Sequence, residues 1–159
     1  MTLNKPNGKS LIFNIALSIG AVLVVNALIF GFGWNVETGS TRYIWFEPAG
    51  YVVGIVWVAL FALMGTARWV LNFQVTKDAA RGKLWIVILM ISCLLYPLYA
   101  LATGSVLAGF LGNIETVILS AFVFWRVRRA SNFAAFLVAP VIVWAVFATF
   151  ITLAGLNLI

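Results

Sequence analysis

The sequence predicts an all-α membrane protein built as a bundle of five transmembrane helices. Of its 159 residues, 64% are hydrophobic and only 9% are charged, whereas charged residues make up about a quarter of a soluble domain. Apolar stretches of about 20 residues recur along the chain, and this is the length that a helix needs to cross a bilayer. The short alternating segments of a membrane barrel are missing. We expect residues 1–159 to form a single membrane domain.

The five predicted helices follow each other with short connections. The first apolar run begins after Lys5 and Lys9 and is too long for a signal peptide. Pro97 falls near the end of the third helix, where it can introduce a kink, and Pro140 falls in the first two turns of the fifth. The predicted helices span residues 11–33, 49–71, 84–101, 106–125 and 133–156, and the segments 34–47, 72–83, 102–105 and 126–132 connect them.

The basic residues predict which ends of the helices face the cytoplasm. Five helices with the N-terminus inside place nine of the ten Lys and Arg residues on the cytoplasmic side, and only Arg42 on the other. An excess of Lys and Arg in cytoplasmic loops is typical of membrane proteins. We therefore expect the N-terminus inside and the C-terminus outside. The net charge of +6 then reflects topology, and we expect no nucleic-acid partner.

The residue types present exclude several kinds of chemistry. The chain has no histidine, so histidine bases, histidine metal sites and histidine-ligated haem are excluded. Cys93 is the sole cysteine and has no disulfide partner within the chain. No Ser/His/Asp set, paired membrane carboxylates, metal-ligand cluster or glycine-rich phosphate loop is present. We expect no metal and no required cofactor, and we favour a binding function over an enzymatic one.

The second predicted helix carries an aromatic face. Trp57, Phe61, Met64 and Arg68 fall at i, i+4, i+7 and i+11, which is one side of a helix. An indole deep in a membrane span favours a hydrogen-bond partner, which is compatible with a ligand site. Packing between helices explains the same pattern and is the commoner cause.

Glu115 is the most unusual single residue, because it falls in the middle of the fourth predicted helix. A charge there costs about 3 kcal/mol or more. Its helix face is mostly small, so we expect it to contact other helices. Two interpretations stay open: a polar contact to a ligand, with Ser92 as a second polar group, or a proton site; and, alternatively, a protonated or hydrogen-bonded carboxyl satisfied by a neighbouring helix. Ser92 and Asn113 lie at a suitable depth to be that neighbour.

Two segments resemble the TspO/MBR family of translocator and tryptophan-rich sensory proteins. That family has a Trp-x-Pro-Pro approach to its second helix, followed by Val-Trp-x-x-Leu-Tyr-x-x-Met-Gly. Here the sequence reads WFEPA at 45–49 and VWVALFALMG at 56–65. In the fifth helix the family's Pro-Tyr-x-x-Trp-x-x-Phe-Ala-Thr is similar to PVIVWAVFAT at 140–149.

Several positions depart from the family pattern. Ala49 replaces the second proline, and Val141 replaces the tyrosine of the fifth helix. Thr152 replaces a late asparagine, and the third helix offers Ile88, Ser92 and Leu95 where the family has polar or aromatic residues. The resemblance therefore identifies a divergent member whose ligand can differ from the usual one.

The resemblance implies a pocket between the helices that binds porphyrins and other flat hydrophobic molecules, or sterols in eukaryotic members. It assigns Trp57, Phe61 and Trp144 to the pocket walls with Ala148 one turn below, and Trp45 and Phe46 to a lid. The expected function is that of a sensor or transporter, with a metal-free porphyrin as the natural tetrapyrrole. Oxidative degradation of such a pigment and a helix-packing role in an assembly are the alternatives. The resemblance also implies a possible homodimer, and we expect an integral protein of a bacterial inner membrane.

Overall fold

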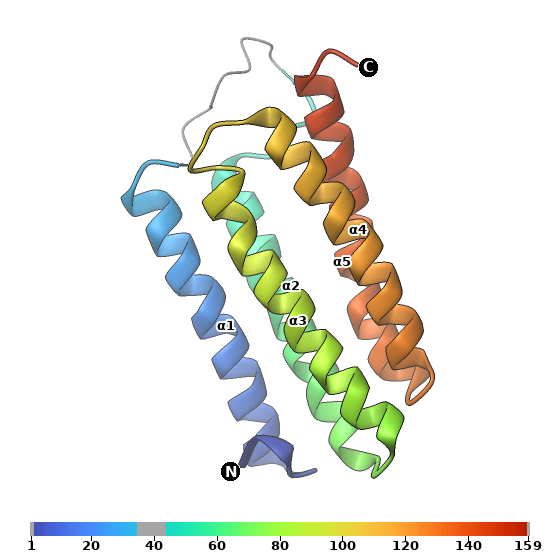
Figure 1. Ribbon diagram of the computed structural model, residues 1–159. Coiled ribbons are helices and arrows are strands. Elements are labelled where there is room, and N and C mark those ends of the chain that lie inside the picture. The colour runs from blue at the N-terminus through green and yellow to red at the C-terminus, as the bar shows by residue number, and fades with distance from the viewer. Residues whose placement is uncertain (1, 35–43, 159) are drawn as a thin grey trace.

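A computed structural model describes residues 2–34 and 44–158. Within these residues the chain forms a bundle of five long helices and contains no strand (Figure 1). Each of the five is long and apolar enough to cross a membrane, so the predicted five-helix fold is confirmed. The helices are α1 (Gly8–Gly31), α2 (Gly50–Val70), α3 (Lys77–Tyr99), α4 (Val106–Arg128) and α5 (Asn132–Gly155), with short 3-10 turns η1 (Thr2–Asn4) and η2 (Leu71–Phe73).

Apart from α2, the long helices begin at capping side chains and not where the apolar runs begin. The hydroxyl of Thr76 accepts a hydrogen bond from the backbone N–H of Ala79 at 3.1 Å, and Asp78 lies in the first turn. Both features stabilise a helix N-terminus. As a result α3 starts at Lys77, and the predicted loop 72–83 is wrong from that residue onwards.

Other predicted bounds shift for a related reason. Asn7 caps α1 through a bond from Ser10 N–H, so α1 begins at Gly8 and not at residue 11. At the same end of the bundle α4 continues to Arg128 and not to residue 125. The length of an apolar run matches the thickness of the hydrocarbon layer. A helix can be longer than this run, because it continues into the interface as long as its ends are capped.

The half of the bundle around Arg68 and Lys83 is packed solid. Side chains from four helices meet there with almost no exposed surface, and α4 packs closely along α5. The fully or nearly fully buried residues of this core are Phe61, Met64, Ala67, Leu71, Ala79, Ile86, Leu89, Val123, Val127, Ala134, Ala135, Val138 and Val141. This core fixes α2 to α5 relative to one another, so the opposite half of the bundle can enclose space.

The contact between α1 and α2 is made through the polar side of α1. Ser10, Asn14, Ser18 and Val22, spaced four residues apart, are its buried residues, while its bulky apolar side chains face outward. In lipid, small and polar residues form the better helix contacts. Gly65 of α2 permits the closest approach, since a Cβ there would lie 2.6 Å from Ser18 Oγ and 2.8 Å from Asn14 O.

The N-terminal segment is bound to the same end of the bundle. The carbonyl oxygen of Leu3 accepts hydrogen bonds from the side chains of Ser10, Asn14 and Asn72, at 2.8, 3.0 and 2.9 Å. Arg68 donates to Asn14 Oδ1 at 2.5 Å and to Asn4 Oδ1 at 3.1 Å. Hydrogen bonds thus connect the polar groups of η1, α1, α2 and η2 where the helices leave the apolar layer.

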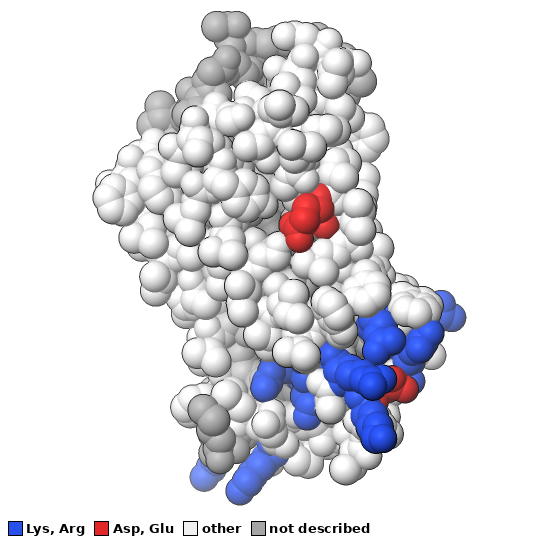
Figure 2. All heavy atoms as spheres, in the orientation of Figure 1, with Lys and Arg blue, Asp and Glu red and all other residues white. Residues whose placement is uncertain are grey.

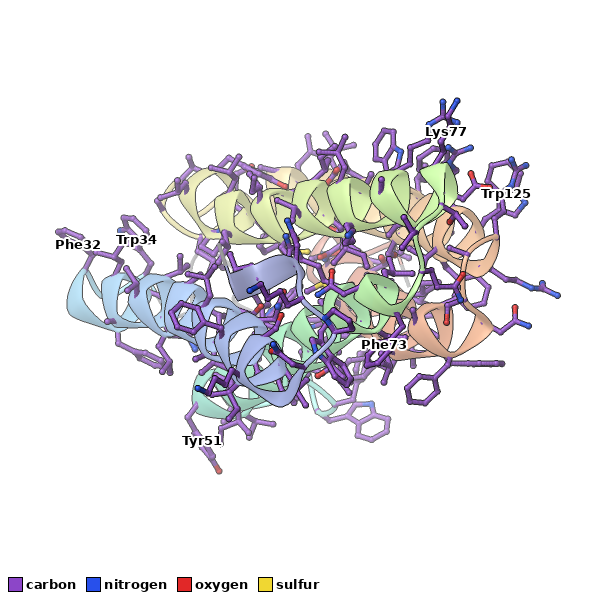
Figure 3. The ribbon with its side chains drawn as sticks, turned by 90° about the horizontal axis from the view of Figure 1, so that it is seen from below. Phe32, Trp34, Tyr51, Phe73, Lys77 and Trp125 are labelled. Carbon is purple, nitrogen blue, oxygen red and sulfur yellow. The ribbon has the colours of Figure 1, made fainter. Side chains whose placement is uncertain are left out.

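Charge is distributed unevenly along the bundle axis. Figure 2 shows the Lys and Arg side chains gathered at one end of the molecule, and Figure 1 shows that the N-terminus lies at this end and the C-terminus at the other. Side chains with aromatic rings mark both ends: Phe32 and Trp34 lie side by side at the end of α1, while Trp125 lies near the start of α3 at Lys77 (Figure 3). Aromatic residues are typical of the two membrane interfaces.

Candidate ligand-binding site

A cavity of about 650 Å³ lies between the helices, in the half opposite the basic end. All five helices contribute to its wall. The second halves of α1, α3 and α5 and the first halves of α2 and α4 meet at the same end of this antiparallel bundle. Its lining comprises Val22, Val25, Asn26, Ile29, Phe30, Trp34, Ile44, Glu47, Pro48, Ala49, Gly50, Val53, Gly54, Trp57, Phe61, Cys93, Leu94, Tyr96, Pro97, Ala100, Leu101, Ser105, Val106, Gly109, Asn113, Trp144, Ala148, Ile151, Thr152 and Gly155.

Aromatic side chains from α2 and α5 line the inner part of this cavity. Trp57 and Phe61 lie one turn apart on α2, with ring centroids 6.1 Å apart in an edge-to-face arrangement. Trp144 comes from α5, and Ala148 lies one turn further along that helix. The structure therefore brings together in one cavity the four residues that the sequence assigned to the pocket walls. Met64 of the same stripe is fully buried in the core below.

Polar side chains also reach the cavity, among them Asn26, Tyr96, Asn113 and Thr152, which sequence reasoning did not assign to it. Asn26 donates to Gly54 O at 3.3 Å, and Asn113 donates to Thr152 Oγ1 at 3.4 Å. The hydroxyl of Tyr96 lies 3.5 Å from Gly109 O. The sequence feature that could have identified Asn26 and Asn113 is an amide side chain within an apolar run, because such a group is rarely turned toward lipid. These side chains place N–H and O–H groups at the cavity wall.

Small residues make room for these groups. A Cβ at Gly54 would lie 3.3 Å from Asn26 Nδ2, and a Cβ at Gly109 would lie 3.3 Å from Tyr96 Oη. Gly50 and Gly54 both line the cavity, and Gly54 also lies against Asn26 of α1.

The approach to α2 borders the cavity through different residues from those predicted. Ile44, Glu47 and Pro48 line it. Trp45 is 81% exposed and Phe46 is half-buried, packed against Trp45 and against Phe147 of α5, so neither lines the cavity. Trp45 and Phe46 are the central residues of a turn closed by the hydrogen bond from Glu47 N–H to Ile44 O at 3.0 Å, and neither is among the lining residues. Residues 35–43, which hold the rest of the predicted loop, lie outside the described range.

The structure places Glu115 and Ser92 together, but away from the cavity. The Ser92 hydroxyl donates to the Glu115 carboxylate, 3.0 and 2.9 Å from its two oxygens. Both belong to the outer surface of α3 and α4, where Glu115 is exposed. The expectation that this face of α4 contacts other helices of the chain holds for Gly112, which packs against Tyr96 and Tyr99 of α3, but Glu115 itself contacts Ser92 and is otherwise exposed. Asn113, the other suggested neighbour, points into the cavity instead.

Comparison with known proteins gives a single type of match. The model of the TspO/MBR family matches residues 18–156, which include the whole cavity and all five helices from the second half of the first onward. Comparisons with curated proteins and with solved structures give no match. Family members are membrane proteins that bind ligands or act as sensors. With a match over most of the chain and five membrane-spanning helices around a cavity, this integral multi-pass membrane protein belongs to the TspO/MBR family.

Proposed function

We propose that this protein binds a flat, hydrophobic, ring-bearing molecule of the porphyrin type in the cavity between its helices, and acts as a sensor or transporter for it. The observation that carries the proposal is the aromatic lining contributed by Trp57, Phe61 and Trp144. Aromatic faces favour flat conjugated rings, and ligand sites are typically apolar with a few polar groups that set orientation. Asn26, Asn113 and Tyr96 are suited to that second task.

The charged residues of the cavity lining restrict where acidic groups of a ligand can lie. Its described residues include Glu47 but no Lys or Arg. An ionised carboxylate is stable in an apolar site only with a cation or several donors. We infer that the ring system occupies the inner part and that any acidic substituents lie toward the open end.

Protoporphyrin binding to the purified protein tests this proposal. Titration is expected to quench tryptophan fluorescence saturably, and Trp57→Ala and Trp144→Ala are each expected to weaken binding about tenfold, or about 1.4 kcal/mol, since each removes one aromatic wall. Trp125→Ala is the matched control. Its ring lies 3.9 Å from the Arg129 guanidinium at the opposite end of the bundle, so the affinity should stay unchanged.

Two outcomes would count against the proposal. Equal affinities in the wild type and in both cavity variants would place the porphyrin elsewhere. A protein-dependent loss of the porphyrin Soret band in light would point to pigment degradation as the function of the same cavity.

Esterification of the ligand gives an independent prediction. The dimethyl ester of protoporphyrin is expected to bind at least as tightly as the free acid, because no basic side chain in the described lining compensates a carboxylate. Competition between the two in one quenching assay measures this. A markedly weaker ester would mean that the acid groups are bound by cations that the cavity wall does not provide.

We further propose that the basic end faces the cytoplasm and that the protein resides in a bacterial inner membrane. Support comes from the gathering of Lys and Arg at the end that holds the N-terminus (Figure 2). Homodimerisation, implied by the resemblance alone, stays a prediction.

A further inference from the structure

A second hollow lies on the outer surface of the bundle, separate from the inner cavity. It is an open groove of about 620 Å³ between α3 and α4, with Glu115 and Ser92 in its wall. Its other lining residues are apolar or aromatic and several are strongly exposed: Ile88, Ile91, Leu95, Tyr99, Ala108, Leu111 and Gly112. Figure 2 views this side of the molecule and shows an acidic side chain surrounded by uncharged atoms.

The carboxyl group of Glu115 lies at the depth of the hydrocarbon layer. It belongs to the tenth position of α4, about 14 Å along the axis from Val106, the first residue of that helix, whereas the hydrocarbon layer is about 30 Å thick. The Ser92 hydroxyl supplies one proton for hydrogen bonding to two carboxylate oxygens. One hydroxyl does not offset the cost of an acidic charge facing lipid. The residues that line the groove therefore do not fully compensate the charge of Glu115.

No cation of α3 or α4 is near enough to meet this requirement. On α3 the nearest basic residue is Lys83, about 14 Å from Ser92 along the helix axis. On α4 it is Arg126, about 16 Å from Glu115. Neither helix of the groove therefore supplies the compensating positive charge, which a bound cation can provide.

The shape of the groove favours a small molecule over a second copy of the chain. Two grooves packed face to face around a two-fold axis would leave their hollows unfilled and would bring two Glu115 carboxylates together. Like charges facing one another in lipid are destabilising. A compact ligand with apolar groups around a positive charge instead fills the hollow and neutralises the carboxylate.

We propose that the groove between α3 and α4 is a second binding site, which takes a lipophilic organic cation from the bilayer. Glu115 neutralises the cation, and Ser92 holds the carboxylate in place by its hydrogen bond. The ring of Tyr99 provides an aromatic surface beside the charge. It lies over Gly112, where a Cβ would come within 2.6 Å of the tyrosine hydroxyl oxygen, so the glycine keeps this ring against the groove floor.

Binding of radiolabelled tetraphenylphosphonium to the full-length protein in lipid nanodiscs tests the site. Glu115→Gln keeps the size of the side chain and an acceptor for Ser92 but removes the charge, and it is expected to lower the affinity by about tenfold or more. Ser92→Ala is expected to lower it by only a few-fold, because the charge remains. Tetraphenylborate, which has the same shape and the opposite charge, should not compete.

Asp78→Asn is the matched control, since it removes one acidic charge from the distant end of α3 and should leave the affinity unchanged. Retained porphyrin quenching in Glu115→Gln would show that this variant is folded. Equal phosphonium affinity in Glu115→Gln and the wild type would overturn the proposal. So would a loss of binding in Trp57→Ala, which would place the cation in the inner cavity, or a conversion of dimer to monomer by Glu115→Gln without phosphonium binding in the wild type.

Discussion

Gly65→Ala is expected to destabilise the protein by about 1–3 kcal/mol, the usual cost of overfilling a packed contact. The added Cβ would lie 2.6 Å from Ser18 Oγ and 2.8 Å from the Asn14 carbonyl oxygen. One of these two atoms belongs to the backbone, so α1 has to move away as a unit. The bond from the Ser18 hydroxyl to Asn14 O, 2.7 Å long, lies within α1 and moves with it, so it does not relieve the clash. Thermal unfolding in detergent, followed by tryptophan fluorescence, measures the effect.

Gly20→Ala provides the control for this experiment. Gly20 also lies within a membrane-spanning helix, but a Cβ there would meet nothing within 4 Å. Its replacement should be neutral or slightly stabilising, because alanine favours the helix by up to about 1 kcal/mol. If Gly65→Ala unfolds at the same temperature as Gly20→Ala, the two helices are not in the close contact described here.

Asn14→Leu is expected to cost about 3 kcal/mol and to release the N-terminal segment. Asn14 is 2% exposed, donates to Leu3 O and Ser10 O, and accepts from Arg68. Leucine has a similar size but leaves the guanidinium without this acceptor, and hydrogen bonds to charged groups contribute about 1.5–3 kcal/mol. Hydrogen exchange of the first residues should rise, together with a lower unfolding temperature.

Thr66→Val is a suitable comparison for Asn14→Leu. Within the described residues the Thr66 hydroxyl bonds to Ala62 O of its own helix, so its loss should leave exchange at the N-terminus unchanged. Unaltered exchange in Asn14→Leu would mean that other contacts hold the segment, such as the bond from Trp69 Nε1 to Asn7 O.

The candidate site was only partly predictable from the sequence. Trp57 and Trp144 stood out because spaced motifs marked them, and both line the cavity. Trp45 and Phe46 belong to a matching motif as well, yet they point away from the cavity. A motif specifies the order of residues along the chain, whereas the direction of a side chain in a non-helical segment depends on local backbone angles that no periodicity reveals.

The surroundings of Glu115 were also only partly predictable from the sequence. Its position within an apolar run identified it as exceptional, and a polar neighbour at the same depth was expected. Both Ser92 and Asn113 met that condition, but only the rotation of α3 and α4 about their axes decides between them. That rotation follows from the packing of Tyr96 and Tyr99 on Gly109 and Gly112, so Ser92 faces outward with Glu115 while Asn113 faces the cavity.

The sequence alone predicts that the chain spans a membrane with five helices, because the length and composition of apolar runs depend only on local chemistry and bilayer thickness. It also determined the aromatic stripe on α2, since helical periodicity alone places Trp57 and Phe61 on one face. The tertiary structure decided which faces meet. In lipid every apolar face is equally compatible with its surroundings, so close packing and polar contacts, as at Gly65 and Asn14, select the arrangement that encloses the cavity and leaves Glu115 at the surface.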